Sequence, residues 1–199
     1  VPFREADLWN GYPEETNAPY GIAKRALLVM AQAYRAEFGC NMIMLFPANL
    51  YGPGDNFDFE TSHVIPAMIR KFDDAVRLGH RTVTLWGDGT PTREFLYVND
   101  AVDGLILAAN SYDRPDPVNL GSNCEISIHA IARMIARKTG FLGSIDWDTS
   151  KPNGQPRRAI DATLARSKFQ FEAKTTLSDG LDATIQWFRE HRSSEKADR

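Results

Sequence analysis

The sequence has little that would support a metal centre, a membrane span or a nucleic-acid surface. It contains two cysteines, Cys40 and Cys124, and their spacing is not that of metal ligands. Its net charge of −3 gives no basic excess, so nucleic-acid binding would need a local positive patch. No apolar run reaches the length of a membrane span, and no signal peptide is recognisable. We therefore expect a cytoplasmic protein with two buried free thiols and no metal, membrane or nucleic-acid partner.

The sequence also lacks a Gly-rich phosphate-binding turn. No G-x-x-G-x-x-G or similar turn follows a strand, although such turns hold the pyrophosphate of dinucleotides in doubly wound folds. The chain begins with Val1 rather than methionine. We interpret it as a fragment of a longer protein.

The feature around which the rest of the chain is interpreted is Tyr20, followed four residues later by Lys24. Both lie at the start of an apolar run that predicts a helix covered on most sides and ended by Gly39. Residues i and i+4 share a helix face, so the ammonium group could favour tyrosinate and assist proton transfer. Alone, this pair is more often a surface tyrosine and a solvated lysine on an amphipathic helix. Only accompanying motifs could make it a catalytic candidate.

Alternating helical and strand patterns predict an α/β fold with a parallel sheet. Residues 42–46 form a short apolar run typical of a strand buried on both faces. Residues 47–56 follow as an irregular segment with two glycines and two prolines. Loops at the carboxyl ends of parallel strands line ligand crevices, so this segment is a candidate binding loop.

The remaining pattern predicts further elements and their caps. Ser127 and Thr176 are predicted N-caps, the latter in a capping box with Asp179, and Asp100 is interpreted as an N-cap rather than a catalytic acid. Residues 193–199 form a polar tail that we expect to fray. The predicted strands are 82–86, 92–98, 118–121 and 145–147, and the predicted helices are 64–76, 101–110, 128–139 and 177–191.

Several motifs occur together in one order, and their combination is more specific than any of them alone. They are Y-x-x-x-K at 20–24, PANLYGP at 47–53, SHVIP at 62–66, LWGDGTPTREF at 85–95 and KPNG at 151–154. This combination resembles the extended short-chain dehydrogenase/reductases of the NAD-dependent epimerase/dehydratase family, which act on nucleotide sugars. The resemblance extends from Val1 to about His191. It is nearest to members that epimerise and reduce a GDP-4-keto-6-deoxy sugar with NADPH.

The resemblance implies the C-terminal part of a Rossmann-like doubly wound parallel sheet plus a small α/β substrate-binding lobe. The sheet part would comprise about residues 1–55 and 94–125. The lobe would comprise about residues 56–93 and 126–191. The family relatives also imply a homodimer for the complete protein.

The resemblance further implies catalytic and cofactor-binding roles. Tyr20 would give a proton to the sugar C4 oxygen during hydride transfer, while Lys24 would assist it and bind the nicotinamide ribose. His63 would contact the cofactor and act as acid and base in epimerisation, although a histidine there is also typical of a partly exposed residue near a helix start. The nicotinamide end of NADP, or of NAD, would be lined by Pro47, Ala48, Asn49 and Leu50.

Substrate contacts are implied for Asn49, Trp86 and Arg93, the last through its planar, bidentate guanidinium group. Arg93 could instead form a surface ion pair with Glu94. Two positions depart from the family pattern, because Lys71 stands where Arg is frequent and Asn153 where Asp is frequent. These departures leave the sugar nucleotide open.

Alternatives remain at this stage. One is a UDP- or dTDP-sugar 4-epimerase or dehydratase of the same family, a second is a non-catalytic nucleotide-sugar-binding fragment, and a third is an interaction module without a ligand. The phosphate loop, the NAD or NADP selector, the active-site Ser and a reactive Cys lie upstream of Val1 in this family. We therefore expect residues 1–199 alone to be inactive, to self-associate and to bind NADP(H) weakly.

Overall fold

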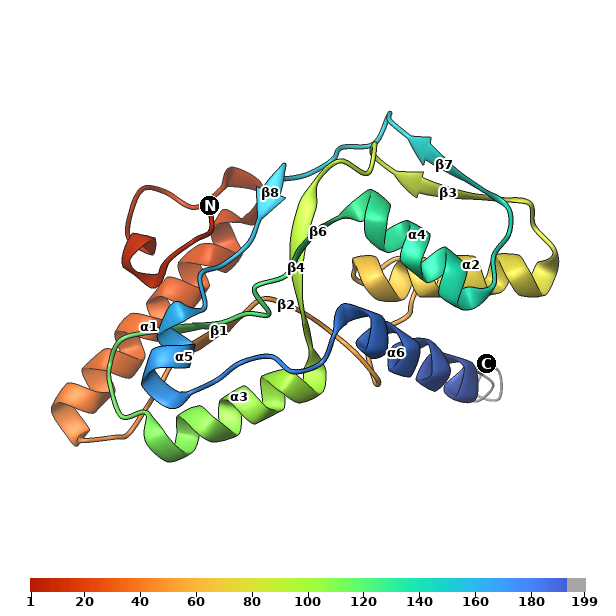
Figure 1. Cartoon of the computed structure of the whole chain (residues 1–199). Coiled ribbons are helices and arrows are strands. Elements are labelled where there is room, and N and C mark those ends of the chain that lie inside the picture. Colours follow the sequence, from red (N-terminus) through yellow and green to blue (C-terminus); the bar gives the residue numbers. More distant parts are fainter. Residues whose placement is uncertain (193–199) are drawn as a thin grey trace, which may run out of the picture.

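The computed structural model describes residues 1–192, in which helices alternate with short strands (Figure 1). The predicted α/β class with parallel strands is confirmed. The helices are α1 (Ala18–Phe38), α2 (Val64–Leu78), α3 (Val98–Ser111), α4 (Ile128–Thr139), α5 (Thr163–Phe169) and α6 (Leu177–His191), and the strands are β1 (Leu45–Pro47), β2 (Asn49–Tyr51), β3 (Thr82–Trp86), β4 (Thr92–Tyr97), β5 (Val118–Leu120), β6 (Glu125–Ser127), β7 (Ser144–Asp148) and β8 (Arg157–Arg158).

The strands form three separate sheets. Parallel pairs join β1 to β5, β2 to β4, and β3 to β7. Strand β4 also pairs with β6 in the antiparallel sense and with β8 in the parallel sense. Strands β1 and β2 are separated by Ala48 alone, yet they pair with different neighbours. The chain thus passes from one sheet to another at this residue.

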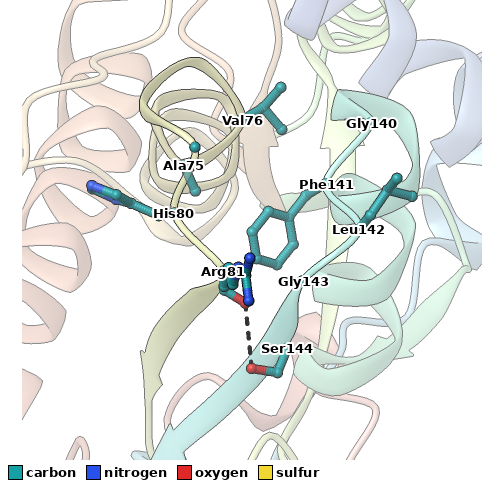
Figure 2. Close-up of a pocket in the computed structure, with 10 residues that line it drawn as sticks. Ala75, Val76, His80, Arg81, Gly140, Phe141, Leu142, Gly143 and Ser144 are labelled. Atoms are coloured by element: carbon teal, nitrogen blue, oxygen red, sulfur yellow. Dashed lines mark hydrogen bonds between the residues drawn. The ribbon is translucent and has the colours of Figure 1, made fainter.

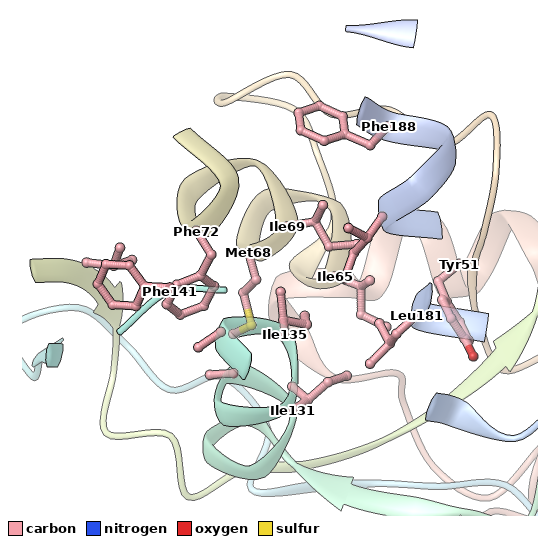
Figure 3. Close-up of a cluster of buried hydrophobic side chains, with 14 of the residues drawn as sticks. Tyr51, Ile65, Met68, Ile69, Phe72, Ile131, Ile135, Phe141, Leu181 and Phe188 are labelled. Atoms are coloured by element: carbon pink, nitrogen blue, oxygen red, sulfur yellow. The ribbon is translucent and has the colours of Figure 1, made fainter. Parts of the chain in front are cut away.

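Two hydrophobic cores hold the elements together. In one, apolar side chains of α2, α4 and α6 interdigitate, as Figure 3 shows for Ile65, Ile135 and Leu181. The second core packs α3 and α5 on β5, with Leu120 and Phe169 among its buried side chains. Strand β4 runs between the two groups of helices (Figure 1). Phe95 and Tyr97 belong to the first core, whereas Leu96 belongs to the second, because alternate residues of a strand face opposite sides.

Local capping chemistry sets several helix ends, as predicted. Ser127 accepts a hydrogen bond from the Ala130 amide at 3.1 Å, and Thr176 accepts one from the Asp179 amide at 3.1 Å. Helix α1 ends at Gly39, which adopts φ +65° and donates its amide proton to the Arg35 carbonyl. A left-handed conformation of this kind favours glycine because it lacks a Cβ.

Four expectations from the sequence are wrong. A strand at 42–46 buried on both faces is expected, but β1 comprises only Leu45–Pro47 and is half-buried. Among the described residues it pairs with β5 alone. Residues 49–51 form a strand instead of an irregular loop. Helix α3 begins at Val98, and Asp100 lies in its first turn. Buried Asp100 does not cap the helix, because its carboxylate accepts hydrogen bonds from the Thr175 amide and hydroxyl at 2.9 and 3.0 Å.

Exposure differs from the expectations in two further places. Cys40 and Cys124 are both exposed, because each lies in a connection outside the two cores. In the described part of the chain, helix α1 buries three of its residues, whereas apolar side chains such as Met30 and Phe38 are exposed. The helix is therefore not covered on most sides. The expected fraying of 193–199 concerns residues outside the described range.

A nearly buried carboxylate joins the C-terminal helix to α2. The Asp73 side chain, 5% exposed, accepts from the Arg189 guanidinium at 2.7 Å and also pairs with Arg192. Arg189 donates as well to the Thr139 carbonyl at 2.8 Å, so one ion-pair cluster links α2, α4 and the end of α6. Breaking a buried pair leaves the remaining charge without compensation.

We predict that Asp73→Asn lowers the free energy of unfolding by roughly 2–3 kcal/mol, less than the roughly 3–5 kcal/mol of a fully buried pair, because both arginines are partly exposed. Urea unfolding measures this. The matched control is Asp182→Asn, which removes a surface pair with Lys138 and should cost less than about 1 kcal/mol. Equal losses in the two variants would contradict the assignment of Asp73 as the principal link.

Candidate active site

A cleft of about 710 Å³ opens where the chain changes sheets between β1 and β2. The start of α1, residues 47–55, the start of α2, strand β4 and residues 158–160 line it. Ala48 donates its amide proton to the Leu120 carbonyl at 2.8 Å, whereas Asn49 is already aligned with Phe95 of β4. Because the two sheets separate here, side chains of both can face one cavity. Ligand crevices of open α/β folds lie at such points of strand divergence.

Tyr20 and Lys24 are close together at the start of α1. Tyr20 is 64% exposed and borders the cleft. The Lys24 ammonium lies 5.2 Å from the centroid of the Tyr20 ring, over the ring rather than beside the hydroxyl. The predicted i, i+4 neighbourhood is present, and the flexible lysine side chain would need to turn for its ammonium to reach the hydroxyl.

Residues 47–50 form the wall of the cleft next to Tyr20. Pro47 is exposed and Leu50 is 41% exposed, so both present apolar surface. The Asn49 side chain instead donates to the Glu94 carbonyl at 2.8 Å, which ties this wall to β4. A flat apolar ring could therefore pack against this wall, next to the Tyr20 phenol.

His63 occupies the N-cap position of α2 without capping it. Its exposed side chain lies at the same cleft as Tyr20. Asp55 lines the cleft too, and burial raises the pKa of its carboxyl against the lowering effects of the Asn56 amide and the His63 charge. Asp55 Oδ2 and Ser62 Oγ are buried without a hydrogen-bond partner in the described part of the chain. The cleft therefore contains a titratable pair, His63 and Asp55, within electrostatic reach of each other.

Two arginines face the cleft from neighbouring strands. Arg93 of β4 is aligned with Arg158 of β8, and both line the cavity. Arg93 donates to the carbonyls of Thr92 and Gln155 at 2.8 and 2.7 Å. Burial, and then repulsion from Arg158, lower the pKa of the Arg93 guanidinium. No carboxylate of the described residues pairs with either arginine, so together they form a potential anion site.

Arg158 is a candidate binding residue that the sequence motifs do not indicate, because it stands next to a second arginine, Arg157. Strand alternation distinguishes them, because adjacent side chains face opposite sides. Arg157 faces Glu125 at 2.8 Å and holds the pKa of that carboxyl at about 2, with a further contribution from Thr92. Arg158 is left for the cleft. The sequence shows two adjacent arginines, but only the register of β8 with β4 identifies Arg158 as the one that lines the cleft.

Three predicted substrate residues lie outside the cleft lining, along β3. The Lys71 ammonium donates to the Thr84 carbonyl at 3.1 Å, and burial lowers its pKa. Trp86 is 68% exposed, with the Lys151 ammonium 5.7 Å from its ring centroid. Asn153 accepts from the Asp88 amide at 2.9 Å, next to the turn that follows Trp86. The structure thus gathers Trp86 and Asn153 at one end of β3, separate from the Tyr20 cleft.

A second hollow of about 560 Å³ lies between the ends of α2 and α4 (Figure 2). His80, Arg81 and Phe141 line it, and the Ser144 hydroxyl donates to the Arg81 carbonyl at 3.5 Å. None of the residues predicted as functional belongs to it. The first cleft is therefore the candidate active site.

Two further searches cover the described part of the chain. Among residues 1–192, no helix combines the length and apolar character needed to cross a membrane. Within the same range, no three His, Cys, Asp or Glu side chains converge as metal ligands would.

The described residues thus combine an α/β fold of parallel strands with a strand-end cleft lined by Tyr20, His63, Arg93 and Arg158. The pattern of the NAD dependent epimerase/dehydratase family matches residues 2–121. The chain belongs to this family, as its motifs predicted.

The chain is also similar to individual members of this family. The chain is 43% identical over 187 residues to the GDP-L-fucose synthase of Sinorhizobium fredii, covering 94% of this chain and 59% of that protein. A GDP-L-fucose synthetase structure from Naegleria fowleri bound to NADP shares 32% identity with a TM-score of 0.89, covering 98% of this chain and 62% of that one. UDP-glucose 4-epimerase of Thermotoga maritima, solved with UDP-glucose, shares 25% identity with a TM-score of 0.83, covering 96% and 58%. The chain spans about three fifths of the length of the curated relatives it matches. The Rossmann-like part of the predicted fold is confirmed by these structures.

Proposed function

We propose that the complete protein is a nucleotide-sugar epimerase/reductase that converts GDP-4-keto-6-deoxy-mannose to GDP-L-fucose with NADPH. The observation that carries this proposal is one cleft that joins Tyr20, His63 and the Arg93–Arg158 pair. Acid–base groups and an anion site in a single cavity suit a reaction on a sugar attached to a diphosphate. Relatives named GDP-L-fucose synthase support the choice of sugar nucleotide.

The nicotinamide end of NADP(H) would lie against the wall formed by residues 47–50. Its exposed apolar side chains fit a flat ring, and Tyr20 borders the same space. When bound, NADPH would supply the hydride that reduces the sugar ketone. Lys24 would turn toward the nicotinamide ribose, and His63 would form part of the opposite wall. The relative solved with NADP supports this cofactor over NAD.

The protein's own residues would move the protons. Proton removal beside a ketone leaves an enediolate, and epimerisation requires a proton on its opposite face. His63 can carry that proton because an imidazole gains and loses protons near neutral pH. Tyr20 would donate a proton to the C4 oxygen as the ketone becomes an alcohol.

The nucleotide would extend from the cleft toward β3. Arg93 and Arg158 would hold the diphosphate, since guanidinium groups make paired, charge-assisted hydrogen bonds to phosphate oxygens. Asn49 would contact the sugar end, and Trp86, Lys71 and Asn153 would contact the nucleoside end. Trp86 supports this assignment with an exposed aromatic face on which a base can stack.

A UDP-sugar 4-epimerase is the second candidate. The fold similarity to UDP-glucose 4-epimerase favours this candidate. Lys71 and Asn153 also favour it, because they replace the Arg and Asp that are frequent at these positions in the GDP-sugar members of the family. Binding assays with GDP and UDP distinguish the two candidates.

The division into two parts also belongs to this proposal. The Rossmann part comprises about 1–55 and 94–125 and the substrate lobe about 56–93 and 126–191. The two cores support this division in part, because Phe169 and Phe171 pack with the Rossmann part, whereas Tyr51, Phe95 and Tyr97 pack with the lobe. We further propose a cytoplasmic homodimer. Size-exclusion chromatography with light scattering tests the oligomeric state.

For the complete protein, we predict that Tyr20→Phe lowers kcat about 10²–10⁴-fold while GDP affinity stays the same, because the substitution removes a proton donor and little volume. Steady-state kinetics and calorimetric titration measure both quantities. The control is Tyr34→Phe on the same helix, which should behave as the parent protein. Activity within about tenfold of the parent would exclude the proposed role of Tyr20.

His63→Gln should reduce epimerisation more than ketone reduction, since glutamine keeps a hydrogen bond but cannot exchange a proton near neutral pH. Incorporation of solvent deuterium beside the keto group reports epimerisation, and NADPH oxidation reports reduction. His80→Gln in the second hollow is the control. If exchange and reduction fall equally, His63 has a positioning role instead.

Arg93→Lys should weaken GDP binding about tenfold or more, because a charge remains but the bidentate geometry is lost and such hydrogen bonds contribute about 1.5–3 kcal/mol. Isothermal titration with GDP measures the effect. Arg81→Lys provides an exposed control outside the cleft. An unchanged Kd for GDP in Arg93→Lys would remove Arg93 from the substrate site.

A further inference from the structure

Glu94 is the least explained charged residue beside the candidate active site. It follows Arg93 in β4 and is 2% exposed. No basic side chain of residues 1–192 forms an ion pair with it. A buried carboxylate without a cation is costly unless hydrogen bonds satisfy its oxygens. The bonds it makes should therefore indicate why a charge is kept there.

The two carboxylate oxygens of Glu94 hold two different segments. Oε1 accepts from the Asn123 amide at 2.9 Å, in the loop between β5 and β6. Oε2 accepts from the Ile160 amide at 2.9 Å, two residues after β8. Among side-chain termini, only a carboxylate offers two acceptor oxygens and no donor. A glutamine would present an NH₂ group to one of these amides.

The surrounding backbone is shaped to admit this carboxylate. A Cβ added to Gly121 would lie 2.4 Å from Glu94 Oε1, so any larger residue there would displace the carboxylate from its present position. Asn123 adopts φ +55°, the left-handed region that few residues other than glycine, Asn and Asp enter. The loop thus holds Asn123 in an uncommon backbone conformation, and the amide of this residue bonds to Glu94.

Strand β8 needs such a link because it is weak on its own. It has two residues, and the two cationic side chains Arg93 and Arg158 lie directly opposite each other. Like charges opposite each other on neighbouring strands repel and oppose pairing. On the other face, Arg157 is held by Glu125. The chain after Arg158 is joined to Phe3 through hydrogen bonds at Ala159 and Asp161, but these bonds do not reach β4. The bond from Ile160 to Glu94 is the one that ties this part of the chain to β4.

We propose that Glu94 is a positioning residue that docks β8 on β4 and thereby keeps Arg158 opposite Arg93, forming a preorganised anion site for a nucleoside diphosphate. The inference rests on the proposed function, because it assigns the arginine pair to the diphosphate. A site whose two charges are already in place loses less conformational freedom on binding. Glu94 also lines the cleft, but both of its carboxylate oxygens are engaged by backbone amides, so it acts through Arg158.

The test uses the natural full-length protein and GDP as the probe. Glu94→Gln should weaken GDP binding about tenfold, raise KM for the sugar nucleotide and leave kcat and NADPH affinity within about twofold. Arg158→Gln should also weaken GDP binding. Because Glu94 acts through Arg158, Glu94→Gln should cost no more than about twofold further when Arg158 is already glutamine.

Asp100→Asn is the matched control. Asp100 is likewise a buried carboxylate that accepts a backbone amide, from Thr175, but it lies outside the cleft. This variant should lower stability and leave the Kd of GDP within about twofold.

Several results would overturn the proposal. They are an unchanged Kd for GDP in Glu94→Gln, an equal loss of GDP and NADPH affinity, or additive effects of the Glu94 and Arg158 substitutions. If Arg158→Gln leaves GDP binding intact, the diphosphate assignment fails and the inference fails with it. If Arg158→Gln weakens binding and Glu94→Gln does not, the inference fails alone.

A measurement on the parent protein remains decisive if the Glu94 variants do not fold. Hydrogen exchange should show the Asn123 and Ile160 amide protons protected, and GDP should increase the protection of residues 157–160. Exchange at both amides as fast as in an open loop would overturn the proposal.

Discussion

The change of strand partner across Ala48 is the constraint on which the rest of the site depends. One residue before it the chain pairs with β5, and one residue after it the chain pairs with β4. Strand β5 packs in the second core, whereas β4 contributes side chains to both cores. The cleft is a consequence of this divergence, and Tyr20, His63 and the two arginines reach it from four different elements.

The charges around the cleft are separated by strand alternation. Arg93 and Arg158 line the cavity from β4 and β8. The Glu94 carboxylate of β4 accepts from the backbone amides of Asn123 and Ile160, and Glu125 of β6 pairs with Arg157. Unneutralised cations thus remain available for an anionic ligand. The carboxylates stabilise the strands that carry these cations without forming ion pairs with them, which would compete with the ligand.

Local features of the fold were predictable, and features set by distant partners were not. Ser127 and Thr176 are recognisable as caps from the sequence because each cap side chain and the amide that donates to it lie three residues apart. Asp100 was misassigned because its partner, Thr175, lies 75 residues away. The same limit applies to the site, where motifs placed Tyr20, Lys24 and His63 in sequence, but only the β4–β8 register distinguishes Arg158 from Arg157. The exposure of Cys40 and Cys124 likewise depends on packing that no local pattern encodes.

The most direct test is a crystal structure of the complete protein with NADP⁺ and GDP bound together. We expect the nicotinamide against residues 47–50, within reach of Tyr20, and the GDP diphosphate between Arg93 and Arg158. A diphosphate bound away from this arginine pair, or a nicotinamide remote from Tyr20, would contradict the account of one cleft that unites binding and proton transfer.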